Sequence, residues 1–66
     1  MQITVNGDTR TVEDGATVAE LVKLFDLPPE RVAVEVNERL VRRVQYGDTR
    51  LSAGDRVEIV TLVGGG

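Results

Sequence analysis

The hydrophobic residues near the start of the chain follow the period of a β-strand. Ile3 and Val5 alternate with polar residues, as expected for a strand that buries one face. Residues 6–8 are Asn-Gly-Asp, and Asn-Gly supplies the positive φ angles that a tight hairpin turn requires. Residues 9–13 contain β-branched Thr and Val, which suit a pleated surface. This opening segment therefore predicts a β-hairpin.

The period then changes to that of an α-helix. Thr17 and Glu20 have the spacing of a capping box, in which each side chain accepts a hydrogen bond from the backbone N–H of the other. Apolar residues follow at positions i, i+3, i+4 and i+7, namely Val18, Leu21, Val22 and Phe25. Residues 28–29 are both proline, and proline disfavours helix in the residue before it. We expect one short helix that ends before this pair.

The second half of the chain again shows strand patterns. Residues 32–36, Val-Ala-Val-Glu-Val, predict a strand with its valines on one face. Residues 37–39 predict a turn, and residues 40–41 a short strand. Residues 42–51 have no clear period, so their order is left open, although residues 49–51 allow a brief strand.

The final pattern is a turn at residues 52–55, Ser-Ala-Gly-Asp, followed by an alternating strand over residues 56–62. The inward positions of the strands are expected to meet the apolar side of the helix. These positions are Ile3, Val5, Val34, Val36, Val57 and Ile59. One helix on one sheet is a two-layer arrangement that suits a chain of 66 residues.

In this arrangement the first and last strands can lie side by side and parallel, as in the β-grasp fold. We therefore predict an α+β fold of the β-grasp, ubiquitin-like type, with a mixed sheet of four to five strands packed on one helix. The β-grasp domain is assigned to residues 1–63, and a flexible C-terminal glycine tail to residues 64–66.

Composition narrows the possible functions. The chain has no Cys and no His, which excludes disulfides and thiolate metal sites and removes the commonest general base. We therefore expect no metal site. The net charge of −3 and the presence of only two aromatic residues, Phe25 and Tyr46, argue against nucleic acid as a partner. No apolar run approaches the roughly 20 residues that span a membrane, and no secretory signal opens the chain. A cytoplasmic protein without a membrane partner is expected.

The glycine tail is the principal candidate for chemistry. Glycine adds no side-chain packing and costs the most backbone entropy to order, so these residues do not serve stability. We hypothesise that the α-carboxylate of Gly66 is the reactive group and enters a narrow channel in another protein. The alternatives are a frayed terminus and a glycine linker without function.

Four segments together resemble the ubiquitin-like sulfur carriers, and most closely the ThiS-type carriers of thiamine biosynthesis. They are Thr-Val-Ala-Glu-Leu at 17–21, Val-Glu-Val-Asn at 34–37, Gly-Asp-Arg-Val-Glu-Ile-Val at 54–60 and the terminal glycines. The resemblance spans the whole chain. It implies a sulfur-carrying cosubstrate rather than an enzyme, with no bound cofactor.

The resemblance also implies partners and a reaction. An E1-like adenylating enzyme of the ThiF type would use ATP to adenylate the Gly66 carboxylate. A sulfur donor, such as the persulfide of a cysteine desulfurase, would then convert the adenylate to a thiocarboxylate. A thiazole synthase of the ThiG type would take this sulfur to form the thiazole ring. Gly64 and Gly65 correspond to the tail that the partners grip.

One segment departs from the family's usual pattern. Members often have Val-Pro-Arg after the short strand, whereas this chain has Val41, Arg42 and Arg43. Arg43 fits the position of the family's arginine, and Tyr46 fits an aromatic residue that commonly follows. Arg42 replaces the proline, which leaves the fold prediction intact and weakens the assignment to thiamine.

Two surface features are candidate partner-binding sites. Val60 and Leu62 are expected to face away from the helix beside the tail, either as a docking patch or as ordinary surface. Arg43, with its basic neighbours, would steer an acidic partner, or it belongs to a solvated turn.

Other functions remain open from the sequence. They are the small subunit of molybdopterin synthase, a carrier for tRNA thiolation or cysteine synthesis, and a non-catalytic β-grasp interaction module with an incidental tail.

Overall fold

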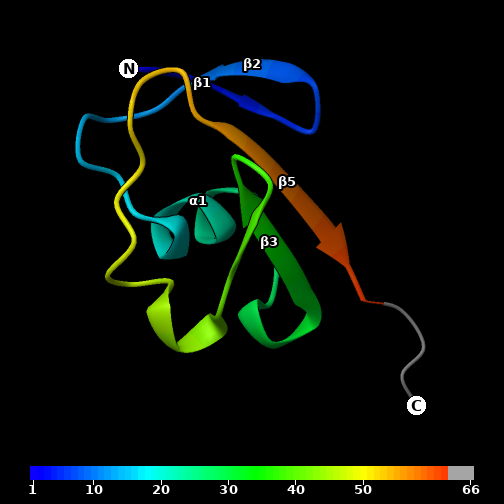
Figure 1. Ribbon diagram of the computed structural model, residues 1–66. Helices are drawn as coiled ribbons and strands as arrows, with labels where there is room; N and C mark the ends of the chain where they lie inside the picture. Colours follow the sequence, from blue (N-terminus) through cyan, green and yellow to red (C-terminus); the bar gives the residue numbers. More distant parts are fainter. Residues whose placement is uncertain (63–66) are drawn as a thin grey trace.

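Five strands form one mixed sheet, and helix α1 (Val18–Leu24) lies across one side of it (Figure 1). The computed structural model describes residues 1–62. The strands have the order β2-β1-β5-β3-β4 in the sheet. Their bounds are β1 Gln2–Val5, β2 Asp8–Thr11, β3 Val32–Val36, β4 Arg39–Val41 and β5 Arg56–Thr61. Two short 3₁₀ helices, η1 (Pro29–Arg31) and η2 (Arg43–Gln45), lie in the connections.

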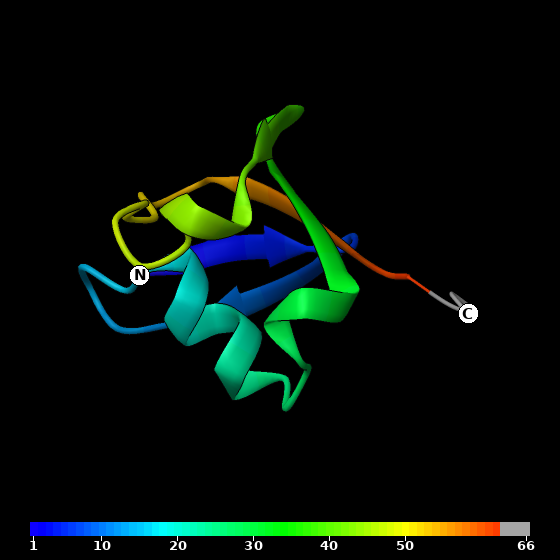
Figure 2. The same ribbon diagram turned by 90° about the horizontal axis from the view of Figure 1, so that it is seen from below.

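The centre of the sheet is the parallel pair β1 and β5. Thr4 lies opposite Arg56, and Val5 lies opposite Val57. All other neighbouring strands are antiparallel. Figure 2 shows α1 on one side of β1 and β5. The predicted β-grasp fold, with its parallel first and last strands, is confirmed.

Both hairpins use two-residue turns with positive φ angles. In the first, Asn6 has φ 50° and Gly7 has φ 85°, as the sequence predicted. In the second, Asn37 has φ 53° and Glu38 has φ 70°. The predicted turn over residues 37–39 was one residue too long, because Arg39 already belongs to β4. The error arose because a glutamate rarely takes the left-handed conformation that so tight a turn demands.

Helix α1 begins with the predicted capping box. The Thr17 hydroxyl accepts a hydrogen bond from the Glu20 N–H at 3.2 Å, and the Glu20 carboxylate accepts one from the Thr17 N–H at 2.9 Å. At its other end, Asp26 takes φ 58°. The Leu27 N–H bonds to the carbonyl of Val22, and the Asp26 N–H to that of Lys23. This pattern is a Schellman motif, so the helix ends by its own hydrogen bonding before the prolines.

The core lies between α1 and the sheet, and most of its predicted members are buried. Phe25 and Val36 are only half-buried against it. Further core residues come from positions that the prediction did not place there: Ala16, Val41, Tyr46 and Leu51.

The segment 42–51, left open from sequence, is ordered and closes the core. Its residue Tyr46 is 5% exposed, and the phenol donates a hydrogen bond to the Val32 carbonyl at 3.4 Å. Its backbone carbonyls also cap the helix start, because Val18 N–H bonds to Thr49 and Ala19 N–H bonds to Tyr46. The brief strand expected at 49–51 is a single bridge between Arg50 and Thr17.

Candidate functional site

Strand β5 leads from the centre of the sheet toward the C-terminal residues (Figure 1). An asparagine holds it on each edge. On one edge, the Asn6 side chain donates to the Ile59 carbonyl at 3.1 Å and accepts from the Ile59 N–H at 2.8 Å. On the other edge, the Asn37 N–H donates to the Arg56 carbonyl at 2.7 Å, and its side-chain oxygen accepts from the Arg56 N–H at 2.9 Å.

Asn6 extends the pairing of β5 beyond the end of β1. Strand β1 ends at Val5, and the Asn6 N–H bonds to the Val57 carbonyl at 2.9 Å. The Asn6 amide then satisfies both backbone groups of Ile59, as one more residue of β1 would do. The sequence predicts Asn6 only as a turn residue. The one sign in the sequence of this second role was that both hairpin turns begin with asparagine.

The structure places Val60 and Leu62 on the face of the sheet away from α1. Val60 is 58% exposed and alternates with the buried Ile59, which confirms its predicted orientation, and Leu62 is 54% exposed. Thr61, between them, is also exposed, because the buried stretch of β5 ends at Ile59. The Leu62 N–H bonds to the Arg31 carbonyl at 2.7 Å, so the register with the β3 side persists to the last described residue.

Arg43 lies apart from these two residues. It begins η2, which follows the edge strand β4, whereas Val60 and Leu62 belong to or follow the central strand β5. Arg43 is exposed, and it sits near Tyr46. Burial raises the pKa of the Tyr46 phenol above its ordinary value, and the charge of Arg43 opposes this rise. Tyr46 therefore remains a neutral hydrogen-bond donor at physiological pH, and Arg43 is left as a surface cation.

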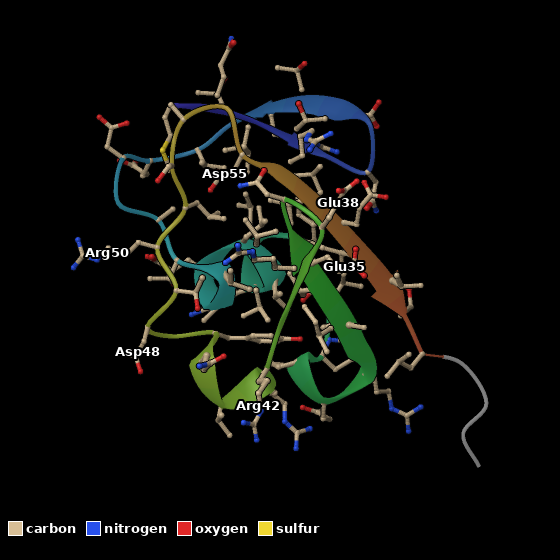
Figure 3. All side chains as sticks on the ribbon, in the orientation of Figure 1. Glu35, Glu38, Arg42, Asp48, Arg50 and Asp55 are labelled. Atoms are coloured by element: carbon tan, nitrogen blue, oxygen red, sulfur yellow. The ribbon has the colours of Figure 1, made fainter. Side chains whose placement is uncertain are left out.

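The backbone explains why Arg42 can replace a proline. Arg42 has φ −76° and ψ 145°, which lie within the range that a proline ring allows. Val41 lies opposite Val34 in a hydrogen-bonded pair of β4 and β3. Hydrogen-bonded and non-hydrogen-bonded pairs alternate along an antiparallel ladder, so the next residue, Arg42, is in a non-hydrogen-bonded position. The Arg42 N–H consequently points away from β3 and has no ladder bond to lose. Figure 3 shows its side chain projecting from the end of β4.

The predicted reactive group lies outside the described residues, as do Val63, Gly64, Gly65 and Gly66. Within residues 1–62, no group of three or more potential metal ligands comes together. In the same part of the chain, no helix has the length and apolar character to cross a membrane.

A mixed sheet with a central parallel pair and one helix across it defines the β-grasp class of ubiquitin-like proteins. Within that class, the chain matches the ThiS family over residues 3–66 and belongs to this family. It is a family of small sulfur carriers rather than of catalysts.

Similar proteins agree with this assignment. The crystal structure of the thiamine biosynthesis protein ThiS from Geobacter metallireducens has a TM-score of 0.85 and 35% identity, with all of both chains covered. The sulfur carrier protein ThiS of Bacillus subtilis is 33% identical over 94% of this chain and 96% of its own length. A thiazole synthase of Magnetococcus marinus is 39% identical over the whole chain, which spans only 20% of that protein.

Proposed function

We propose that this chain is a sulfur carrier for thiazole formation in thiamine biosynthesis, acting through the carboxylate of Gly66. The family match carries the proposal, because it runs from residue 3 to residue 66 and so includes the glycine tail, residues 64–66. The arrangement of β5 supports it. Hydrogen bonds on both edges fix the strand that leads to the tail.

The proposed chemistry needs no catalytic side chain in the carrier. A carboxylate is a poor electrophile because it is already anionic. In the adenylating enzyme, a carboxylate oxygen attacks the α-phosphorus of ATP and pyrophosphate leaves. The resulting acyl-adenylate has a good leaving group, so the terminal sulfur of a persulfide attacks the carbonyl carbon and AMP departs. A thiol then cleaves the S–S bond of the acyl disulfide, which leaves the thiocarboxylate on the carrier and a disulfide on the donor side. The carrier contributes the carboxylate and a surface that its partners recognise.

A thiazole synthase is the proposed acceptor of the sulfur. A segment similar to the whole of this chain forms about a fifth of a Magnetococcus marinus thiazole synthase. That arrangement favours a carrier that works beside such an enzyme. The molybdopterin, tRNA-thiolation and cysteine-synthesis alternatives share the same tail chemistry and differ in the acceptor.

The test is the intact mass of the chain after incubation with an E1-like adenylating enzyme, ATP, a persulfide donor and a thiol reductant that cleaves the acyl disulfide. We expect a gain equal to the exchange of one oxygen for one sulfur, confined to the C-terminal peptide. Omission of ATP is the control. The proposal would be contradicted if the mass of this chain stayed unchanged while the same enzyme loaded sulfur onto another carrier.

Val60 is proposed to contribute to the partner-docking surface. Val60→Asp places a charge where the partner would bury an apolar side chain, so we expect affinity for the adenylating enzyme to fall at least about tenfold. Because Val60 is 58% exposed, the thermal midpoint should hardly change. Titration calorimetry measures the affinity.

Leu24→Asp is the matched control, since Leu24 is 67% exposed on α1, on the other side of the sheet from Val60. It should bind like the wild-type chain. Equal affinities for wild type and Val60→Asp would exclude Val60 from the docking surface.

A further inference from the structure

Two glutamates face each other on the side of the sheet away from α1. Glu35 of β3 lies directly opposite Glu58 of β5. Along an antiparallel ladder, hydrogen-bonded pairs of residues alternate with pairs that are not hydrogen-bonded. The Leu62 N–H bonds to the Arg31 carbonyl, and counting along the register from this pair makes Glu35 and Glu58 a hydrogen-bonded pair. Their Cβ atoms are therefore about 5 Å apart. Figure 3 shows Glu35 on β3, on the side toward β5.

Neither glutamate forms an ion pair within the described chain. The one ion pair of residues 1–62 joins the N-terminal ammonium to Asp14 at 3.2 Å, far along the sequence from either glutamate. Like charges directly opposite each other destabilise a sheet. The fold thus carries two carboxylates at positions where a neutral pair would serve its stability better.

Exposed apolar side chains border the acidic pair. Leu40 of β4 lies opposite Glu35 and is 67% exposed. Val60 follows Glu58 by two residues on the same face, and Leu62 follows by two more. Leu40, Glu35 and Glu58 form a row across three strands, and Val60 and Leu62 extend it toward the C-terminal end of β5. We call these five residues the acidic-apolar face.

We propose that Glu35 and Glu58 form an electrostatic docking pair that engages arginine or lysine side chains on the adenylating enzyme, with apolar contacts around them. This inference rests on the proposed function. An enzyme that holds ATP and brings a carboxylate to its α-phosphorus must offset several negative charges, so Lys and Arg are concentrated around that site. A carrier with net charge −3 is attracted to such a surface, and the acidic pair orients its face toward it.

The test compares full-length Glu35→Gln/Glu58→Gln with full-length Glu13→Gln/Asp48→Asn. Both variants remove two negative charges. Glu13 lies in the loop before α1, and Asp48 lies in the loop after η2, so neither belongs to the acidic-apolar face. Association with the adenylating enzyme is followed by stopped-flow fluorescence at ionic strengths from about 0.01 M to 0.15 M, where screening becomes strong.

For Glu35→Gln/Glu58→Gln we expect the association rate constant at low salt to fall roughly tenfold and its salt dependence to flatten. The control variant should remain within about twofold of wild type. The thermal midpoint of the first variant should rise by a few degrees because the repulsion is removed. A lowered midpoint would show that the pair stabilises the fold and would overturn the inference.

Two other results would also overturn it. One is an association rate and salt dependence equal to those of the control variant. The other is a defect confined to thiazole synthase, which would assign the pair to a different partner. The mass gain of the wild-type chain is measured with the same enzyme. If the wild type loads sulfur and the Glu35→Gln/Glu58→Gln variant associates as fast as the wild type, only the docking pair is refuted. If the wild type never loads sulfur, the proposed function is refuted.

Discussion

Deletion of Gly65 and Gly66 is expected to abolish sulfur loading while leaving the thermal midpoint within about 1 °C of wild type, since surface changes remote from packed contacts are nearly neutral. The last buried residue of β5 is Ile59, and the last described backbone hydrogen bond of the chain is made by Leu62. Stability should therefore not depend on the deleted residues.

The shortened chain still ends in a glycine carboxylate, at Gly64. Its loss of sulfur loading would therefore come from a tail too short to reach the reaction site of the partner. Two extended residues span about 7 Å. A misplacement of about 1 Å already costs a reaction roughly a hundredfold. We expect adenylate formation, measured as ATP-dependent pyrophosphate release, to fall below detection.

Gly65→Ala is the companion variant because it keeps the length of the tail and adds one methyl group. If the channel in the partner is narrow, the added methyl group should lower the rate of adenylate formation without abolishing it. Full loading of the chain that lacks Gly65 and Gly66 would contradict this dependence on the length of the tail. Partner binding without any loading of the full-length chain would instead favour the alternative of a β-grasp interaction module with an incidental tail.

Local signals in the sequence were sufficient for most of the fold. Asn-Gly at residues 6–7 predicted the first hairpin because its turn chemistry is contained in two residues. The capping box predicted the helix start because both partners lie within one turn, at Thr17 and Glu20. Alternating apolar residues predicted β3 and β5 because each strand buries one face.

The missed features depend on contacts between distant segments. Tyr46 and Leu51 have no periodic pattern around them, and their burial depends on the chain closing under α1. The opposition of Glu35 and Glu58 depends on the register of β3 against β5, which no local motif specifies. Alternation did give the outward direction of Val60, but not its place in a face that also includes Leu40.

Asn6 is expected to be among the largest contributors to stability outside the apolar core. Its side chain makes two partly buried hydrogen bonds to a residue 53 positions away, and its backbone has φ 50°. Asn6→Gly keeps the conformation and removes both bonds, so we expect it to lower the free energy of unfolding by about 1–3 kcal/mol. Asn6→Ala adds the penalty of a left-handed conformation, for about 2–4 kcal/mol in total.

Urea denaturation measures these losses, and amide exchange at Ile59 locates them. Asn37→Gly is the matched control, because Asn37 also occupies the first position of a hairpin turn and also bonds to β5. Its side-chain bonds are exposed, so water replaces them and the loss should be smaller than for Asn6→Gly. Equal stability of Asn6→Gly and wild type would show that the side chain contributes nothing.

The Asn6 loss has a functional consequence because a domain of this size has a total stability of only about 3–10 kcal/mol. Once Ile59 is released on the β1 side, the C-terminal half of β5 is held by β3 alone. Sulfur loading of Asn6→Ala should therefore fall with rising temperature before the whole domain unfolds. Parallel loss of loading and of far-UV circular dichroism would instead mean that Asn6 acts on global stability only.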